Sequence, residues 1–275
     1  MNRFLLTMQY DESLMLPIFL RHYSQYFPPE NIFVIDHGSR VNLVPVEVNR
    51  IYVPRDKAFS EIDRLELIQK IAQGLLCYYD LGVYADCDEL ISFRDVDFDS
   101  LEDVVTYVAG FEIFFNKSSE IIGALNPLEC KPLIFKKTPA WGLGFHSSNA
   151  RPSTLSIPMA HIRYFDRELS RDRLIGRRIV HNNMDKAEVS RGIGGHWGDG
   201  DRELNEFYSY IDSSQANISK AKSFSAIQWN EVFNISAPKS LYVEAEPKFH
   251  AKGDYKIFGG QFYNLTKFFP ELYKG

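Results

Sequence analysis

Cysteine is scarce in this chain, and long apolar runs are missing from it. The 275 residues include three cysteines, Cys77, Cys87 and Cys130, none of them in C-x-x-C spacing. This spacing fits neither a disulfide framework nor a zinc ribbon, so we expect a reducing compartment. No stretch approaches the roughly 18 apolar residues of a membrane-spanning helix, and the N-terminal apolar run is too short for a signal peptide. The sequence therefore predicts a cytoplasmic protein without a transmembrane segment, which is compatible with peripheral membrane association.

An excess of positive charge is also absent. Lys and Arg number 31 against 36 Asp and Glu, which gives a formal net charge of -5 at pH 7. This balance supplies no global positive field for non-specific binding to DNA or RNA, so nucleic acid is not expected as a partner. Hydrophobic residues make up 45% of the chain and charged residues 24%, as in an ordinary globular protein with a core.

Strands and helices alternate along the first 90 residues. Apolar runs predict strands over residues 3–8, 31–36, 50–53 and 82–86, and helical periodicity predicts helices over 14–26 and 60–80. The second helix begins at Ser60-Glu-Ile-Asp63, which has the form of a capping box. This alternation predicts an α/β fold with a parallel sheet between helices, where ligands bind at the carboxyl ends of the strands.

The pattern changes beyond residue 90. A capping pattern predicts a helix over 100–109, and strands over 111–115, 132–136 and 155–165 follow without long helices between them, so the sheet becomes mixed. Later periodicity predicts helices over 167–181, 202–211 and 265–273. We expect two parts, a core of residues 1–165 and a mainly helical C-terminal part of residues 166–275 that packs on it.

Two acids, Asp86 and Asp88, follow the fourth predicted strand directly. Carboxylate oxygens are the ligands that Mg²⁺ and Mn²⁺ prefer, often together with phosphate oxygens. A D-x-D segment is also common in solvated loops, so the spacing alone leaves both interpretations open. Asp36 and the Asp11-Glu12 turn end other predicted strands, and chain direction brings all these acids to one edge of the sheet.

The order of these segments resembles the GT-A nucleotide-sugar glycosyltransferases of the family-2-like and family-92-like clade. The resemblance is carried by DESLMLPIFLRHYSQYFPPENIFVIDHGS, by RDKAFSEIDRLELIQ and by LLCYYDLGVYADCDELI. It extends over residues 5–93, weakens through LIFKKTPAWGLGFH and PMAHIRYFDRELSRDR, and fades after about residue 180. The usual second acid after Asp-Gly-Ser is missing, because Gly38-Ser39 is followed by Arg40, Val41 and Asn42.

The resemblance implies roles for particular residues. Asp36 and the Asp11-Glu12 turn would form the pocket for the base and ribose, Asp86 would lie near the ribose and the metal, and Asp88 would bind Mn²⁺ or Mg²⁺. His161 would complete the metal shell or contact the pyrophosphate, although a histidine in an apolar strand is more often a core residue. The implied enzyme is an inverting glycosyltransferase of the hexosyltransferase type, as in polysaccharide biosynthesis. Its donor would be a nucleotide sugar, with UDP favoured over GDP, and its acceptor a glycan or lipid-linked hydroxyl.

Cations and a catalytic base complete the predicted site. Arg64 on the capped helix would assist the diphosphate, and the candidates for the base are Glu112 and His146. Arginines that could also assist are dense between residues 163 and 178, but the acids among them favour a salt-bridged, solvated helix for most of them. The arginines in question are Arg163, Arg167, Arg171, Arg173, Arg177 and Arg178.

Two other functions fit the same motif. A D-x-D after an apolar strand is typical of haloacid-dehalogenase-type phosphatases, in which the first Asp is the nucleophile. Here Glu89 occupies the usual Thr or Val position and the motif follows the fourth strand, which argues against that class. The second alternative is a catalytically silent protein that binds the nucleotide sugar, which intact Asp86 and Asp88 argue against.

Overall fold

Two six-stranded sheets form the centre of the protein. The computed structural model describes residues 1–55, 57–115, 119–150, 154–194, 200–228 and 261–274. The first sheet has the order β3-β2-β1-β4-β9-β6, with bounds β1 Arg3–Gln9, β2 Ile32–Asp36, β3 Asn49–Tyr52, β4 Leu81–Tyr84, β6 Val105–Thr106 and β9 Ile134–Phe135. β1 to β4 run parallel, and β9 is antiparallel to both of its neighbours. The predicted α/β class with a mixed sheet flanked by helices is confirmed.

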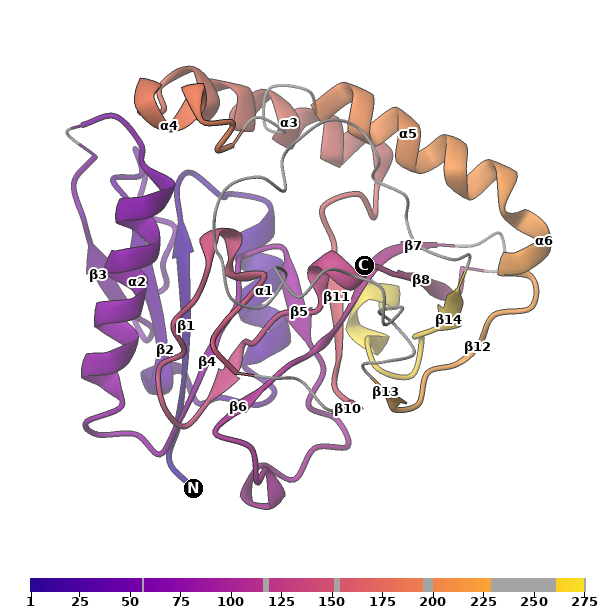
Figure 1. The fold of residues 1–275 in the computed structure, drawn as a ribbon, viewed down its shortest axis with the longest axis horizontal. Coiled ribbons are helices and arrows are strands. Elements are labelled where there is room, and N and C mark those ends of the chain that lie inside the picture. Colours follow the sequence, from indigo (N-terminus) through magenta and orange to yellow (C-terminus); the bar gives the residue numbers. More distant parts are fainter. Residues whose placement is uncertain (56, 116–118, 151–153, 195–199, 229–260, 275) are drawn as a thin grey trace.

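The topology fixes where a ligand would bind. From β1 the chain goes through α1, Met15–Tyr23, to β2 on one side, and from β3 it returns through α2, Glu61–Leu75, to β4 on the other side. Right-handed crossovers in opposite directions place α1 and α2 on opposite faces of the sheet (Figure 1). The strand order therefore reverses between β1 and β4, and the crevice outside their carboxyl ends is the ligand position in sheets of this type.

Local sequence explains the main helix of this layer. The Ser60 hydroxyl accepts a hydrogen bond from the Asp63 backbone N–H at 3.0 Å, which confirms the predicted cap of α2. The helix ends at Leu75, five residues before the predicted end. Ile68 and Ala72 are fully buried and face the core that also contains β1 and β4.

The second sheet has the order β12-β14-β8-β7-β11-β5. Its bounds are β5 Glu89–Ile91, β7 Ala109–Phe115, β8 Ile121–Leu125, β11 Pro158–His161, β12 Lys222–Ser223 and β14 Phe262–Asn264. β5 begins directly after the D-x-D segment, so the chain passes from the first sheet into the second at Asp86–Asp88. A separate pair of strands, β10 Thr154–Leu155 and β13 Ile227–Gln228, is antiparallel.

The C-terminal part contains the helices α3 Arg167–Asn182, α4 Lys186–Ser190, α5 Gly200–Ser213 and α6 Gln215–Ile218, and the first three extend along the upper edge of the view in Figure 1. α3, α5 and α6 pack on one face of the second sheet, whereas α4 contacts the start of α2. Leu174 of α3 and Leu204 and Phe207 of α5 pack with Phe114 and Ile122 of the sheet. The helices predicted over 167–181 and 202–211 are thus confirmed. Because β12 and β14 also come from this part, the division after residue 165 stays a prediction.

The helix predicted over 100–109 is wrong. Only a 3₁₀ turn, η2 Phe98–Ser100, lies at its start, and Val105–Thr106 instead pair with Phe135 and Ile134 of β9. The run Val104-Val105-Thr106 is β-branched, and such residues favour strands once an open sheet edge is available. The C-terminal helix predicted over 265–273 is a short 3₁₀ helix, η9 Pro270–Lys274. Further 3₁₀ turns are η1 Pro29–Asn31, η3 Pro127–Glu129 and η4 Leu143–Phe145. Among the described residues, no helix combines the length and apolar character needed to cross a membrane.

Candidate functional site

The D-x-D segment forms a tight turn between β4 and β5. The Asp86 backbone N–H donates to Glu89 Oε2 at 3.0 Å, and the Glu89 N–H donates to the Asp86 carbonyl at 2.9 Å. All four residues of β4 are buried, so the charged side chains of the D-x-D segment follow the end of this strand. The turn holds Asp86 at the rim of the sheet and turns Asp88 inward, where its side chain is 4% exposed.

Asp86 is held by the first sheet and by α2. Its Oδ1 accepts a hydrogen bond from the Tyr84 hydroxyl at 2.6 Å and forms an ion pair with Arg64. Arg64 also donates to Tyr84 at 3.0 Å and pairs with Glu61 at 3.1 Å. Two residues predicted to contact the nucleotide, Arg64 and Asp86, are thus brought together.

Asp88 is held from the opposite side by α3. Its Oδ2 accepts hydrogen bonds from Arg173 Nη1 at 2.6 Å and from Arg177 Nη2 at 2.8 Å. Burial alone would raise the pKa of Asp88, but the charges of Arg173 and His161 outweigh it and hold this pKa well below its usual value. Arg173 also pairs with Glu12 at 3.0 Å, which ties the turn after β1 to the D-x-D segment.

His161 lies in a ladder of charged residues across three strands. It pairs with Glu89 of β5 on one side and with Glu112 of β7 on the other, so the three side chains share one face of the second sheet. Its Nε2 is 3.3 Å from Asp88 Oδ2, and its Nδ1 is 3.3 Å from Glu112 Oε1. Burial lowers the pKa of His161, but the charges of Glu112 and Glu129 overcome that effect and raise the pKa to about 9.

A second layer of charges surrounds this ladder. Lys131 Nζ is 2.5 Å from Glu89 Oε1 and 3.1 Å from Glu129 Oε2. Arg163 pairs with Glu112 and lies 3.5 Å from Glu129. Burial raises the pKa of Glu89 to about 7, although Lys131 acts against that rise. No local signal in the sequence indicates the pairs of Lys131 with Glu89 and of Arg163 with Glu112, because their members are far apart in the sequence.

The loops after β1 and β2 form the adjoining edge. Asp36 is fully buried. It accepts a hydrogen bond from the Ser39 N–H at 3.0 Å and forms an ion pair with Arg50 at 2.6 Å. Gly38 has φ +71°, and a side chain there would meet Arg55, so the turn requires glycine. Asp11 pairs with Arg40 Nε at 2.7 Å. The acids predicted at one edge of the sheet do lie there, and their roles toward a nucleotide stay predictions.

Glu112 and His146, the residues predicted as the base, occupy different surroundings. Glu112 is 1% exposed and paired with Arg163 and His161. His146 is exposed, and its Nδ1 lies 2.5 Å from the Leu128 carbonyl of η3. Both residues stay predictions for the base.

The predicted metal ligands already have charged partners within the chain. Oδ1 of Asp86 pairs with Arg64, Oδ2 of Asp88 is shared by Arg173 and Arg177, and both nitrogens of His161 face carboxylates. A histidine binds a metal ion only as the neutral imidazole, whereas the surroundings of His161 favour the protonated ring. The guanidinium groups of Arg64, Arg173 and Arg177 would repel a divalent ion held by the same carboxylate oxygens. In this arrangement these residues do not fit a divalent cation.

A second potential ligand set has the same difficulty. The ligand atoms of Glu89, Glu129 and His161 lie within 4.8 Å of one another, which is close enough to surround an ion. Lys131 contacts both carboxylates, however, and so supplies the positive charge that an ion would bring. These three residues therefore form a charge-balanced cluster with Lys131.

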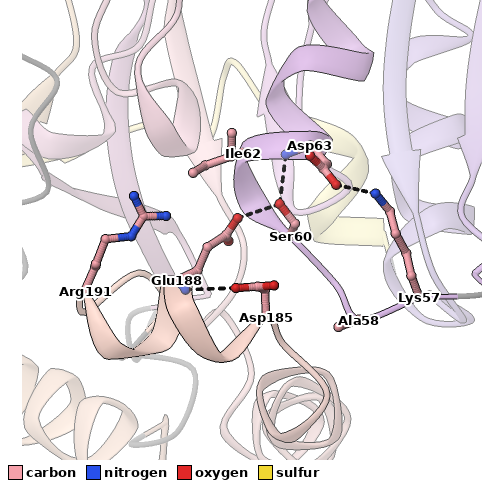
Figure 2. Close-up of a pocket in the computed structure, with 8 residues that line it drawn as sticks. All are labelled: Lys57, Ala58, Ser60, Ile62, Asp63, Asp185, Glu188 and Arg191. Atoms are coloured by element: carbon pink, nitrogen blue, oxygen red, sulfur yellow. Dashed lines mark hydrogen bonds and ion pairs between the residues drawn. The ribbon is translucent and has the colours of Figure 1, made fainter.

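A cavity of about 340 Å³ opens beside the start of α2 (Figure 2). Glu188 of α4 reaches across it, accepting a hydrogen bond from the Ser60 hydroxyl at 2.5 Å and one from the Glu61 N–H at 2.8 Å. Lys57 pairs with Asp63 on its other side at 2.5 Å. Glu188 thus satisfies one open N–H group of this helix end, that of Glu61, and the helix end lies one turn from Arg64.

Comparisons with known proteins do not assign the chain to a family. No family profile matches the sequence, and no curated protein matches it significantly. Among solved structures, a mannose-1-phosphate geranyltransferase from Thermus thermophilus is 11% identical, with a TM-score of 0.28, over 42% of this chain and 42% of its own. A putative glucose-1-phosphate thymidylyltransferase from Bacillus anthracis is 14% identical, with a TM-score of 0.23, over 43% of this chain and 63% of its own. This chain therefore matches less than two thirds of either structure, and likeness at this level establishes neither a shared fold nor a shared activity.

Proposed function

We propose that this protein is a glycosyltransferase that moves a sugar from a nucleotide-diphosphate donor to a hydroxyl group of a glycan or lipid-linked acceptor. The observation that carries the proposal is the position of the D-x-D turn. It follows β4 at the point where the strand order reverses, and Arg64, Arg173 and Arg177 converge on its two carboxylates. Carboxylates and guanidinium groups at such a crevice suit the hydroxyls and phosphates of a nucleotide sugar.

The charges of the site fit the chemistry of transfer. The bond between the anomeric carbon and the phosphate oxygen breaks, and its electron pair stays on the diphosphate. The acceptor oxygen forms the new bond, and its proton passes to a base, for which the sequence predicts Glu112 or His146. Fixed cations next to the leaving diphosphate stabilise the charge that develops there. This proposal does not depend on the predicted Mn²⁺ or Mg²⁺, because the predicted ligands Asp86 and Asp88 already form ion pairs with arginines.

Donor turnover tests this function directly. Incubation with UDP- and GDP-sugars should release free sugar slowly without an acceptor, and Asp86→Asn should lower that rate by about tenfold or more, since a charged hydrogen-bond partner is lost. Asp63→Asn is the matched control, since its side chain is 52% exposed and pairs only with Lys57 among the described residues. Binding without any turnover would indicate the silent binder, and phosphate release from small phosphomonoesters would indicate a phosphatase.

We propose UDP as the nucleotide of the donor. Asp36 and Ser39 form a small buried turn beside Asp11, which suits the base and ribose of a pyrimidine nucleotide. Calorimetric titration with UDP, GDP, CDP and dTDP, each in EDTA and in Mn²⁺, gives the preference. Tighter binding of GDP than of UDP would overturn this choice while leaving the transferase function in place.

A further inference from the structure

Two arginines of α3 lie where the D-x-D motif predicts a divalent cation. The Asp166 side chain accepts hydrogen bonds from the Glu168 and Leu169 N–H groups and so fixes where the helix begins. Leu174 is buried against the second sheet, which sets the rotation of the helix. Positions 173 and 177 are one turn apart on the same side, and both side chains reach Asp88.

Arg173 and Arg177 differ in how many of their N–H donors already form hydrogen bonds. Arg173 donates to Asp88 and to Glu12, so it is held from two directions. Arg177 donates only through Nη2 to Asp88 within the described part of the chain, although its side chain is 23% exposed. A guanidinium has five N–H donors in a planar fork that matches two phosphate oxygens. Arg177 therefore keeps donors for a ligand at the D-x-D turn.

We infer that Arg173 and Arg177 take the place of the divalent cation and bind the diphosphate of the donor, an inference that rests on the proposed function. Together they bring two positive charges to Asp88, the charge of one Mg²⁺ or Mn²⁺ ion. Arg173 holds the pair against Glu12 and Asp88, and Arg177 contacts the phosphates. Binding of the donor and stabilisation of the leaving diphosphate then need no metal.

Calorimetry with UDP and with inorganic pyrophosphate tests the inference. The wild type should bind UDP in EDTA with an affinity within about threefold of that in Mn²⁺. Arg177→Gln should weaken binding in EDTA by about tenfold or more, since about one or two charge-assisted hydrogen bonds are lost. Arg177→Lys keeps the charge without the fork and should recover part of the affinity. Arg178→Gln is the control, because Arg178 pairs with Asp201 on the outer side and is 40% exposed.

The outcomes separate this inference from the proposed function. UDP binding that requires Mn²⁺ and is unchanged in Arg177→Gln would overturn the inference and leave the transferase function standing. No binding of any nucleoside diphosphate, with or without Mn²⁺, would overturn both.

Direct metal binding provides a readout that is independent of activity. Electron paramagnetic resonance of Mn²⁺ should show only the free ion when wild-type protein is added. The variant Arg173→Gln/Arg177→Gln should take up Mn²⁺, because Asp88 then loses both guanidinium partners and keeps only His161 as an ionic partner among the described residues. If that variant fails to fold, Arg177→Gln alone should take up Mn²⁺ more weakly. Stoichiometric uptake by the wild type that is lost in Asp88→Asn would contradict the inference.

Discussion

At the scale of the residue, His161 separates carboxylates that would otherwise repel one another. Its ring lies between Asp88 Oδ2 at 3.3 Å and Glu112 Oε1 at 3.3 Å, with Glu129 at 3.6 Å. All four side chains are buried, so water cannot screen the repulsion. The position of this histidine therefore matters for folding whatever its role toward a ligand.

We expect His161→Asn to destabilise the protein without any ligand. Removing one partner of a buried ionic cluster costs about 3 to 5 kcal/mol, because the remaining charges lose their compensation. Urea denaturation of the wild type and the variant measures the difference. His181→Asn, at the less buried last turn of α3, should change the unfolding free energy little. An unchanged midpoint for His161→Asn would show that the ring has no structural role.

A pH effect is expected at His37, in the turn after β2. Burial, reinforced by the charges of Arg55 and Arg64, lowers its pKa to about 4. The unfolded chain, with a pKa of about 6.5, binds the proton more readily. The stabilisation that neutral His37 contributes to the fold is thus complete above about pH 6.5 and is lost as the pH falls toward about 4.

His37→Gln should remove this acid sensitivity. Between about pH 7 and pH 5 the melting temperature of the wild type should fall further than that of the variant, by about 1 to 3 °C for a half-buried, partly screened group. Paired melting curves at several pH values give the two slopes. Equal slopes would mean that His37 titrates in the fold as it does in the unfolded chain.

At the scale of the element, α4 holds the start of α2. Glu188 satisfies the Ser60 hydroxyl and the Glu61 N–H, and Phe59 and Asp185 add backbone hydrogen bonds between the two segments. Glu188→Ala should cost about 1 to 3 kcal/mol, since a buried N–H loses its acceptor. Hydrogen exchange at residues 59–64 should rise in this variant, whereas Glu206→Ala on the exposed side of α5 should leave it unchanged. Unaltered exchange would show that α2 begins stably without α4.

Helices and strands can be predicted from the sequence where the residues that fix them are close together along the chain. Ser60 identifies the start of α2, and the apolar run before Asp86 identifies β4, so the D-x-D turn and its place at the sheet edge could be predicted. The helix predicted over 100–109 is wrong because Val105 and Thr106 pair with β9, far along the chain. The pairing of Arg173 and Arg177 with Asp88 could not be predicted for the same reason, since nothing near these two arginines in the sequence indicates Asp88.

At the scale of the whole molecule, the end of the chain completes the core. β14 pairs with β8, and Leu265, Phe268 and Phe269 are buried in the same cluster as β1 and β4. Glu271 contacts His22 in the last turn of α1. The part after residue 165 therefore supplies both strands and core side chains to the part before it.

A fragment of residues 1–165 should consequently fail to fold cooperatively. Burying Leu265, Phe268 and Phe269 contributes about 1.5 to 3 kcal/mol each, a sum comparable with the entire stability of an average protein, about 5 to 15 kcal/mol. The fragment would also leave the edge of β8 open to association. Circular dichroism melting and gel filtration of the fragment, alone and co-expressed with residues 166–275, measure this dependence. Co-expression should restore a cooperative transition, and a sharp, native-like transition of the fragment alone would show that its core is complete without the C-terminal part.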